Sequence, residues 1–388
     1  MSNKLFTAVI LLALAQQADA YVLRKDSTGA TVQWKQAVTF VLDTETAKKL
    51  GDGALAAIQA SASQIALAAD VGVTVKTGAT HGVGFSESGA NENAIVLLKD
   101  WPFSHSAIAS TVITVDAVSH QILDADVALN GSSHRFGVMG GGEEGEEAPD
   151  DQPTDDVENT TSHELGHAMG LQHNPDDPKV VMFPTANPGE TSKRDLQADD
   201  KAGLVALYPP GSAASSVPHG CSSAPGPFAA AMVLLLVLVA RRKPAPVPVR
   251  IRRTPKLAIA AVLATAGAAR AAEPLHPVEQ VAEGKVVQVR TLEPKAGERL
   301  LFTEVTLQLS KCHGKQTACD GALKFTVPGG KWGRYEQAVT DQPVPVEGEP
   351  LAVALSQKVE RVFHLEQPAD KAALQKTLTQ FKEESWPK

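Results

Sequence analysis

Three histidines and one glutamate stand within eleven residues of the chain, in the stretch HELGHAMGLQH. His163 and His167 are four residues apart, so on a helix both imidazole rings face one side and reach the same metal ion. Gly170 can take the left-handed conformation that ends a helix, and the chain can then return His173 as a third ligand. Three neutral imidazoles leave one tetrahedral position of Zn²⁺ open for water, which is the arrangement of a catalytic zinc site.

Glu164 adjoins the first of these ligands, where its carboxylate can meet a zinc-bound water. Zinc lowers the pKa of such a water towards ~7 and polarises a bound carbonyl. Glu164 would take the proton as the water attacks a peptide carbon and then pass it to the leaving nitrogen. A structural zinc site has no use for a carboxylate here, so Glu164 distinguishes this interpretation from its alternative, a cell-surface interaction protein with a structural or degenerate zinc site. An ordinary helix with surface histidines is the third interpretation, and the long pattern disfavours it more than a bare HExxH would.

From Thr160 onward the sequence resembles the metzincin zinc proteases and, more narrowly, the matrixin family. The stretch HELGHAMGLQHNPDDPKVVMFP carries the ligands, and Met182 follows the third histidine by nine residues, as in the Met-turn of that family. The segment LQADDKAGLVALYP, Leu196–Pro209, resembles the C-terminal helix of matrixins. The resemblance implies an α/β (α+β) catalytic domain with a mixed five-stranded sheet, a zinc helix and a C-terminal helix. It also implies a zinc metalloendopeptidase that acts on proteins or peptides.

The sequence departs from the family at several positions. Asn174 follows the third histidine, where matrixins usually have serine, and no tyrosine follows Met182 as an extra ligand. No cysteine precedes the zinc motif, so the cysteine switch that keeps relatives latent is absent, and we expect activity without proteolytic activation. Relatives anchor a new N-terminus on an acid of the last helix, which makes Asp199 or Asp200 the expected partner of the Tyr21 amine.

Alternating apolar residues predict five strands ahead of the zinc helix, which begin at Gln36, Val71, Asn93, Ser110 and Gln121. A long stretch rich in Ala, Leu and Ile predicts one helix over Thr46–Ala69. Asp155 is the expected N-cap of the zinc helix, with Glu158 as its capping-box partner. We expect a substrate to lie in extended form along the edge strand Ser110–Asp116, as an added strand.

The segment Glu143–Glu158 carries nine acidic residues together with glycine and proline. Such a composition favours a solvated, flexible loop. Ca²⁺ binding through these oxygens is the sharper alternative, although the spacing does not match an EF-hand loop.

The bulk composition and the N-terminus narrow the class of protein. The 388 residues carry a formal net charge of −8, which argues against a nucleic-acid partner because such a protein needs a basic face. Lys4, the apolar run Leu5–Ala15 and the small residues ADA predict a signal peptide over 1–20 and a protease domain over 21–210. The apolar run is shorter than the ~20 residues that span a bilayer. The sequence does not set the oligomeric state.

The composition changes after the protease domain. A Pro/Ser/Gly linker (211–227) precedes an apolar segment with a basic end (228–243), and a basic stretch with a second signal-like run follows (244–272). The apolar runs 228–240 and 257–269 predict membrane association, and the basic residues between them favour the cytoplasmic side. This region resembles the C-terminal sorting tails of myxobacterial surface proteins, because GCSSAPGP is followed by an apolar run and then by RRK. That resemblance implies processing or lipidation at Cys221 and a secreted or surface-anchored protein of a Gram-negative bacterium, although a free linker cysteine fits equally well.

The last segment, 273–388, alternates in short apolar runs and predicts a small all-β domain, a barrel or a sandwich, with a terminal helix over Asp370–Glu384. Cys312 and Cys319 could form a disulfide loop in an oxidising compartment. No catalytic constellation is visible in it. This segment is either a second exported protein fused to the first or a merged gene, and as a fused module it would serve as a self-inhibitor or a binding module. We expect the two halves to fold independently.

Overall fold

The computed structural model describes residues 21–214 and 280–383, apart from gaps at 105, 141–153, 213, 296, 315–320, 341 and 356–358. The predicted signal peptide, both apolar segments, Cys221 and Cys319 therefore lie outside the described residues. So does most of the acidic run. Within the described part of the chain, no helix is long and apolar enough to cross a membrane.

The first half is built on the five strands that the sequence predicts. They are β2 (Val38–Asp43), β3 (Val73–Gly78), β4 (Asn93–Leu98), β5 (Ala109–Asp116) and β6 (Gln121–Asn130). Their spatial order is β5-β6-β4-β2-β3, and only β5 runs antiparallel to its neighbour, so the sheet is mixed as expected. Short strands β1 (Val22–Leu23) and β9 (Leu171–Gln172) pair with each other, as do β7 (Phe136–Gly137) and β8 (Asp155–Asp156).

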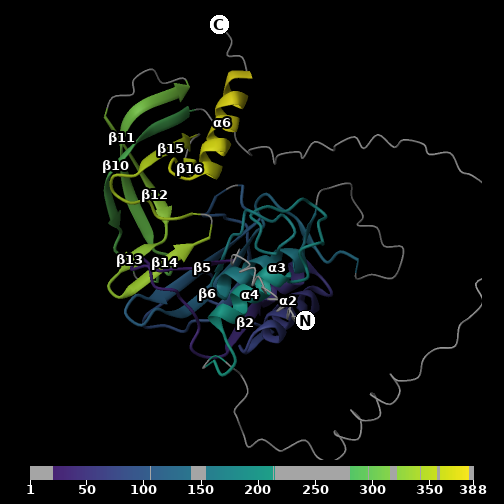
Figure 1. Ribbon diagram of the computed structural model, residues 1–388. Coiled ribbons are helices and arrows are strands. Elements are labelled where there is room, and N and C mark those ends of the chain that lie inside the picture. Colours follow the sequence, from purple (N-terminus) through teal and green to yellow (C-terminus); the bar gives the residue numbers. More distant parts are fainter. Residues whose placement is uncertain are drawn as a thin grey trace, which may run out of the picture. The chain divides into compact units, whose positions relative to one another are not determined.

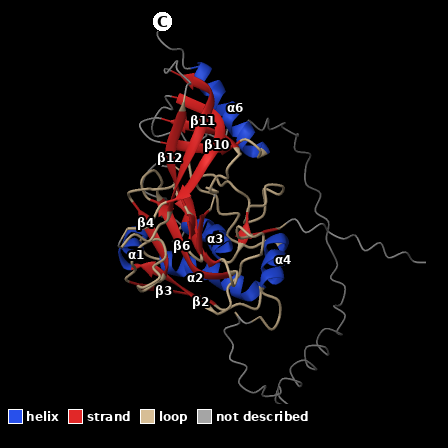
Figure 2. Cartoon of the chain, turned by 90° about the vertical axis from the view of Figure 1, so that its left-hand side faces the viewer, coloured by secondary structure: helices blue, strands red, loops and turns tan. Residues whose placement is uncertain are grey.

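Helices pack against this sheet around one large apolar core (Figure 2). They are α1 (Thr44–Leu50), α2 (Ala54–Ala68), α3 (Val157–Ala168) and α4 (Ala198–Leu207). The prediction of a single helix over 46–69 is wrong, because the chain breaks between α1 and α2. Gly51 and Gly53 have φ angles of 82° and 86° there, a conformation that glycine adopts without steric cost and that a helix cannot contain.

The N-cap of the helix that carries the histidines lies one residue later than predicted. Asp156, not Asp155, is the N-cap, and its side chain accepts a hydrogen bond from the backbone N–H of Asn159 at 2.8 Å. Asp155 belongs to β8, and its carboxylate contacts His134 Nδ1 at 2.8 Å. Arg194 explains the choice, because its guanidinium bonds both oxygens of Asp156, at 2.8 and 2.6 Å, and holds that residue at the helix end.

The second half contains one antiparallel sheet of β10 (Gln280–Thr291), β11 (Phe302–Gly314), β12 (Ala322–Pro328), β15 (Pro350–Leu355) and β16 (Val359–His364). The order is β12-β11-β10-β15-β16, and the two outer strands do not pair, so among the described residues the sheet is open. The prediction of a barrel or sandwich is wrong in this respect, since one face is covered by α6 (Pro368–Glu383) rather than by a second sheet. The terminal helix is confirmed, and Cys312 is disulfide-bonded.

A hairpin from the second half joins the sheet of the first half. It consists of β13 (Gly330–Trp332) and β14 (Tyr335–Val339), and β14 pairs antiparallel with β5 to give a seven-stranded sheet (Figure 1). The expectation that Ser110–Asp116 forms a free edge is therefore wrong for the intact chain, in which every residue of β5 is buried.

Candidate metal centre and catalytic residues

The three predicted ligands converge on one point. The Nε2 atoms of His163, His167 and His173 lie 3.0 to 3.1 Å from one another. Such a triangle suits three nitrogens that each lie about 2.0–2.1 Å from a shared Zn²⁺. Among the described residues, this is the one group of three or more His, Cys, Asp or Glu side chains close enough to hold a metal ion.

Backbone carbonyls orient two of the rings from behind. His163 Nδ1 lies 2.7 Å from the carbonyl oxygen of Val181, and His167 Nδ1 lies 2.9 Å from that of Leu171. A carbonyl can only accept, so each Nδ1 carries the proton and each Nε2 presents its lone pair to the centre. This arrangement fixes the tautomer that metal binding needs.

His167 is the most enclosed of the three ligands. Burial lowers the pKa of its imidazole well below the ordinary value, and the neighbouring His163 and His173 lower it further. The ring is therefore neutral, which is the form that can donate electrons to a metal.

Glu164 follows His163 on α3, and its side chain is held by a residue of β5. Thr111 Oγ1 donates a hydrogen bond to Glu164 Oε2 at 2.6 Å and also lies 3.1 Å from the carbonyl oxygen of Glu164. Both residues are almost completely buried. One carboxylate oxygen is thus engaged by the Thr111 hydroxyl, which restricts the rotamer of the predicted general base.

Met182 lies under the ligand helix, as the Met-turn prediction requires. It is 2% exposed and belongs to the main core. Asp200 fixes the turn, because its carboxylate accepts hydrogen bonds from the backbone N–H groups of Val181 at 3.0 Å and Met182 at 3.1 Å. Val181 also supplies the carbonyl that orients His163, so this one turn serves both the base of the site and a ligand.

The N-terminal end of the first half lies against the same region. Tyr21, Asn174, Met182, Asp199 and Asp200 line one small depression. Asn174, the residue after the third histidine, donates a hydrogen bond from Nδ2 to Asp199 Oδ2 at 2.9 Å. Because Asp200 is engaged by the Met-turn, Asp199 is the better candidate for the predicted pairing with a Tyr21 amine.

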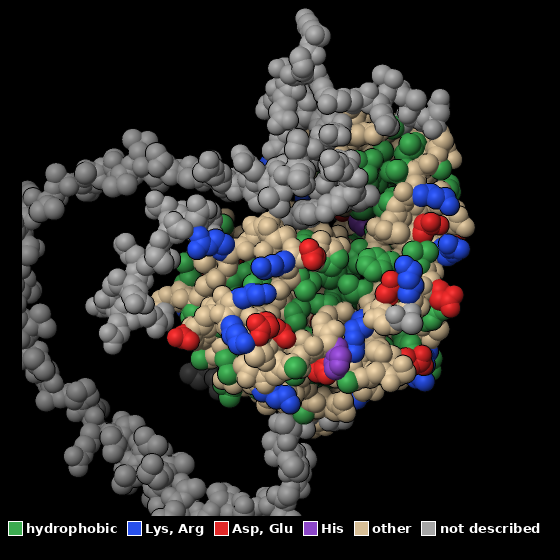
Figure 3. All heavy atoms as spheres, turned by 180° about the vertical axis from the view of Figure 1, so that it is seen from behind, with side chains coloured by type: hydrophobic (Ala, Val, Ile, Leu, Met, Phe, Trp, Pro, Cys, Tyr) green, Lys and Arg blue, Asp and Glu red, His purple; other side chains and the backbone are tan. Residues whose placement is uncertain are grey.

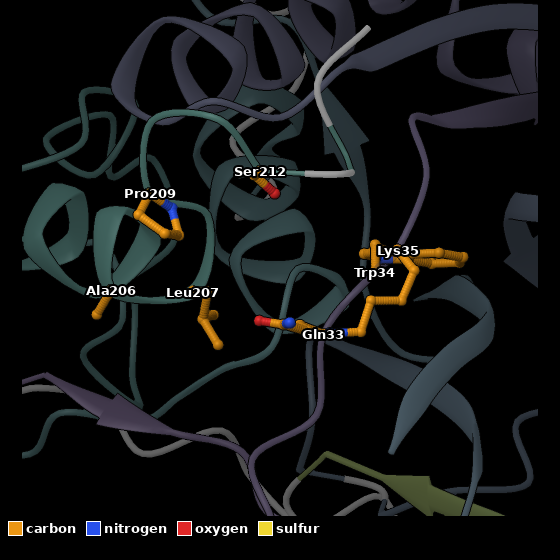
Figure 4. A pocket seen from close by; sticks show the side chains of 7 residues that line it. All are labelled: Gln33, Trp34, Lys35, Ala206, Leu207, Pro209 and Ser212. Atoms are coloured by element: carbon orange, nitrogen blue, oxygen red, sulfur yellow. The ribbon is translucent and has the colours of Figure 1, made fainter. Parts of the chain in front are cut away.

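A larger hollow of about 240 Å³ lies elsewhere in the first half. Figure 4 shows that its lining comes from two segments, residues 33–35 and residues 206–212. None of the predicted ligands or Glu164 lines it, and it contains no acid or histidine. Size alone therefore does not mark the site.

Lys and Arg side chains are interspersed with Asp and Glu on the face of the molecule seen in Figure 3.

The structure brings together the three histidines that the sequence predicts as ligands, whereas the residues that hold them, and those that hold Glu164, were not predicted. Thr111, Asp200 and the carbonyls of Val181 and Leu171 carry no motif of their own. The paired acids of the last helix were the one available signal for Asp200. The suggested Ca²⁺ site falls mostly outside the described residues and is not tested.

Comparison with known proteins agrees with this geometry. Residues 19–209 match the family model described as matrixin. Metalloendoproteinase 1-MMP of Arabidopsis thaliana is 44% identical over 55 residues, which are 14% of this chain and 15% of that protein. Macrophage metalloelastase of Oryctolagus cuniculus is 50% identical over 46 residues, 12% of this chain and 10% of the relative. Matrilysin of Homo sapiens is 43% identical over 47 residues, which are 12% of this chain and 17% of that protein.

The chain thus spans only a small part of the length of these relatives, 15% for the Arabidopsis protein. The family match covers the whole region that builds the metal centre, from β1 to the end of α4. The comparisons therefore show that residues 19–209 are similar to matrixins.

Proposed function

We propose that residues 21–210 hydrolyse peptide bonds in proteins, with Glu164 as general base beside a zinc ion held by His163, His167 and His173. The observation that carries the proposal is the triangle of Nε2 atoms, 3.0 to 3.1 Å apart, with the Nδ1 atoms of two rings directed at carbonyl oxygens. The donor set fits Zn²⁺, because three neutral imidazoles leave a fourth position for water.

A bound Zn²⁺ would polarise the substrate carbonyl and make the water more acidic. The residues of the chain do the rest. Glu164 accepts the proton of the attacking water and delivers it to the amide nitrogen as the C–N bond breaks. Thr111 holds the Glu164 carboxylate through a hydrogen bond to Oε2 and so restricts the orientation of the base. Met182 and the carbonyls behind the rings keep the ligands in place.

The rival function, an interaction protein with a structural zinc site, is less well supported. A structural site closes the fourth position with a protein ligand. Among the described residues no fourth His, Cys, Asp or Glu side chain joins the cluster. The buried Glu164 beside the ligands has a role in hydrolysis and none in a structural site.

The test is the substitution Glu164→Gln in the full chain. We expect it to keep one zinc per chain and to lose nearly all cleavage of an unfolded protein, a loss on the order of 10²–10⁴-fold, because the base is removed while the ligands remain. His173→Ala is the matched control and should lose zinc after dialysis, since it removes one of three ligands. Cleavage by Glu164→Gln at the wild-type rate would exclude the proposed mechanism.

We also propose export to the cell surface or the medium of a Gram-negative bacterium. The support is the sequence alone: the signal-like N-terminus, the sorting-tail resemblance around Cys221 and the apolar segments 228–240 and 257–269. The disulfide at Cys312 agrees with an oxidising compartment. The intact mass of the exported protein would show cleavage before Tyr21 and any modification of Cys221.

A further inference from the structure

The strand β14 fills the outer edge of β5. Its residues Tyr335–Val339 pair in register with Val112–Asp116. Hydrogen bonds continue past both ends of the ladder: Thr340 N–H donates to the Thr111 carbonyl at 3.0 Å, and Ala117 N–H donates to the Arg334 carbonyl at 2.9 Å. The edge that an extended peptide would need is therefore occupied.

The docked segment contacts Thr111, the residue that holds Glu164. Thr111 donates its N–H to Thr340 Oγ1 at 2.8 Å, while its own hydroxyl bonds Glu164. One residue thus contacts the docked segment through its backbone and the general base through its side chain. The chain then turns back, since Gln342 N–H points to the Val339 carbonyl at 3.4 Å. The segment therefore pairs with β5 as far as Thr111 and then leaves the strand direction.

Several buried contacts secure the hairpin. Gln337 is 1% exposed, and its amide accepts from Leu301 N–H at 2.7 Å while it donates to Thr114 Oγ1 at 3.2 Å. Val339 packs in a small apolar cluster with Val112 and other side chains of the first half. A buried amide with its partners satisfied on both sides is typical of a contact that is maintained in the folded protein.

Charged contacts surround the same interface. Arg334 forms an ion pair with Asp116, which lowers the pKa of that carboxyl group. The Glu336 carboxylate accepts from Ser27 N–H at 3.0 and 3.1 Å, and Arg299 donates to the Ala90 carbonyl at 2.6 Å. The hairpin and the loop between β10 and β11, which carries Arg299, therefore contact the first half at several points.

We propose that the β13–β14 hairpin is an intramolecular inhibitor that competes with extended peptide substrates for the edge of β5. The inference rests on the proposed peptidase function. The intact chain would bind peptides weakly while the hairpin is docked and more tightly once the hairpin is released. In such a competition the apparent association constant for the peptide equals the intrinsic constant multiplied by the fraction of molecules in which the hairpin is released.

The experiment uses the full chain with Glu164→Gln, so that binding is measured without cleavage. Arg334→Asp places a carboxylate against Asp116, and Ala338→Pro removes a backbone donor opposite Ile113, where the alternation of the ladder places a hydrogen-bonded pair. Deuterium exchange of the peptide that contains 109–116 reports release of the hairpin, and fluorescence anisotropy reports binding of fluorescein-labelled unfolded casein. We expect faster exchange and an affinity at least about tenfold higher in both variants.

Lys376→Asp is the matched control. It makes the same charge change, but Lys376 is exposed on α6, which does not pair with β5, so exchange and affinity should stay at the wild-type level. Faster exchange with unchanged casein affinity would overturn the proposal. If affinity rises but the Arg334→Asp chain that retains Glu164 cleaves nothing, the competition is upheld and the peptidase function is what fails.

Discussion

Gly166 lies on the ligand helix at the point where it meets the Met-turn. A methyl group there would stand 2.4 Å from the sulfur of Met182, whose side chain is itself buried. The helix therefore needs glycine at this position, although alanine is otherwise the better helix former. The close contact of α3 with the Met-turn depends on this one missing methyl group.

We predict that Gly166→Ala lowers the free energy of unfolding by about 1–3 kcal/mol, because the added methyl overpacks the core beneath the ligands. Denaturant titration of the zinc-saturated chain measures the loss. The double variant Gly166→Ala/Met182→Ala is the control, since the smaller side chain makes room and the two losses should not add. Additive losses would show that the methyl group does not meet Met182.

At this scale the sequence predicts the ligands and Glu164, because the spacing of four residues on a helix determines which side chains share a face. Thr111 could not be predicted. Its role depends on β5 lying beside α3, which is a tertiary contact between residues 53 positions apart. Asp200 is intermediate, because the paired acids were noted but their bonds to the Met-turn depend on the packing of α4.

At the scale of elements, β6 buries two carboxyl groups side by side. Asp126 is engaged by backbone N–H groups of Gly84 at 2.6 Å and Ala94 at 2.7 Å. Asp124 lies two residues away, and burial raises its pKa to about 7. One oxygen of Asp124 has no hydrogen-bond partner among the described residues. The pair is therefore held in the interior with Asp124 protonated at acidic pH.

This pair predicts a pH dependence of stability. The pKa of Asp124 is raised on folding from 3.8 to about 7, so the folded chain holds a proton that the unfolded chain releases. Stability is highest below the unfolded value and falls as pH rises towards 7, after which the penalty is constant. We expect Asp124→Asn to be more stable than wild type at pH 8 and to show a smaller slope, because burial also raises the pKa of Asp126, which the variant keeps. Thermal unfolding of both chains between pH 5 and 8 measures it, and parallel curves would contradict the assignment.

Strands were easier to predict than helix ends. All five strands of the first sheet follow from alternating apolar residues, since one strand face or both must be buried. The helix break at Gly51 and Gly53 and the shift of the N-cap to Asp156 were missed. In both cases the deciding factor was local: a pair of positive φ angles in one, and the ion pair of Asp156 with Arg194 in the other.

At the scale of the whole molecule, the unexpected feature is the shared sheet. The alternation of apolar residues in β14 does not show whether the strand pairs within its own domain or with a strand 219 to 227 residues away, because alternation does not encode the pairing partner. The sequence predicts activity without proteolytic activation for residues 21–210, since no cysteine switch is present. In the full chain the docked hairpin pairs with the edge of β5, and residues 21–210 by themselves lack this contact.

The second half nevertheless has apolar cores of its own. One is formed by Val286, Val305, Leu307, Phe325, Val327, Leu351 and Val353, on one face of the sheet. The other lies under α6 and includes Val281, Phe363 and Leu374. Neither includes a residue of the first half. Among the described residues, Leu300 and Val339 of the second half pack into a cluster with side chains of the first half.

We therefore predict that the fragment 273–388 folds by itself but leaves the hairpin unprotected. Its two cores supply the burial needed for a cooperative transition, whereas β14 loses the partner strand that satisfies its backbone. Circular dichroism on heating should show one transition, and Cys312 should be oxidised. Hydrogen exchange should be slow in β10, β11 and β15 and fast in residues 330–339, and adding the fragment 21–210 should restore protection there. A fragment that is unfolded alone and gains all its structure only on that addition would show that the halves form a single folding unit.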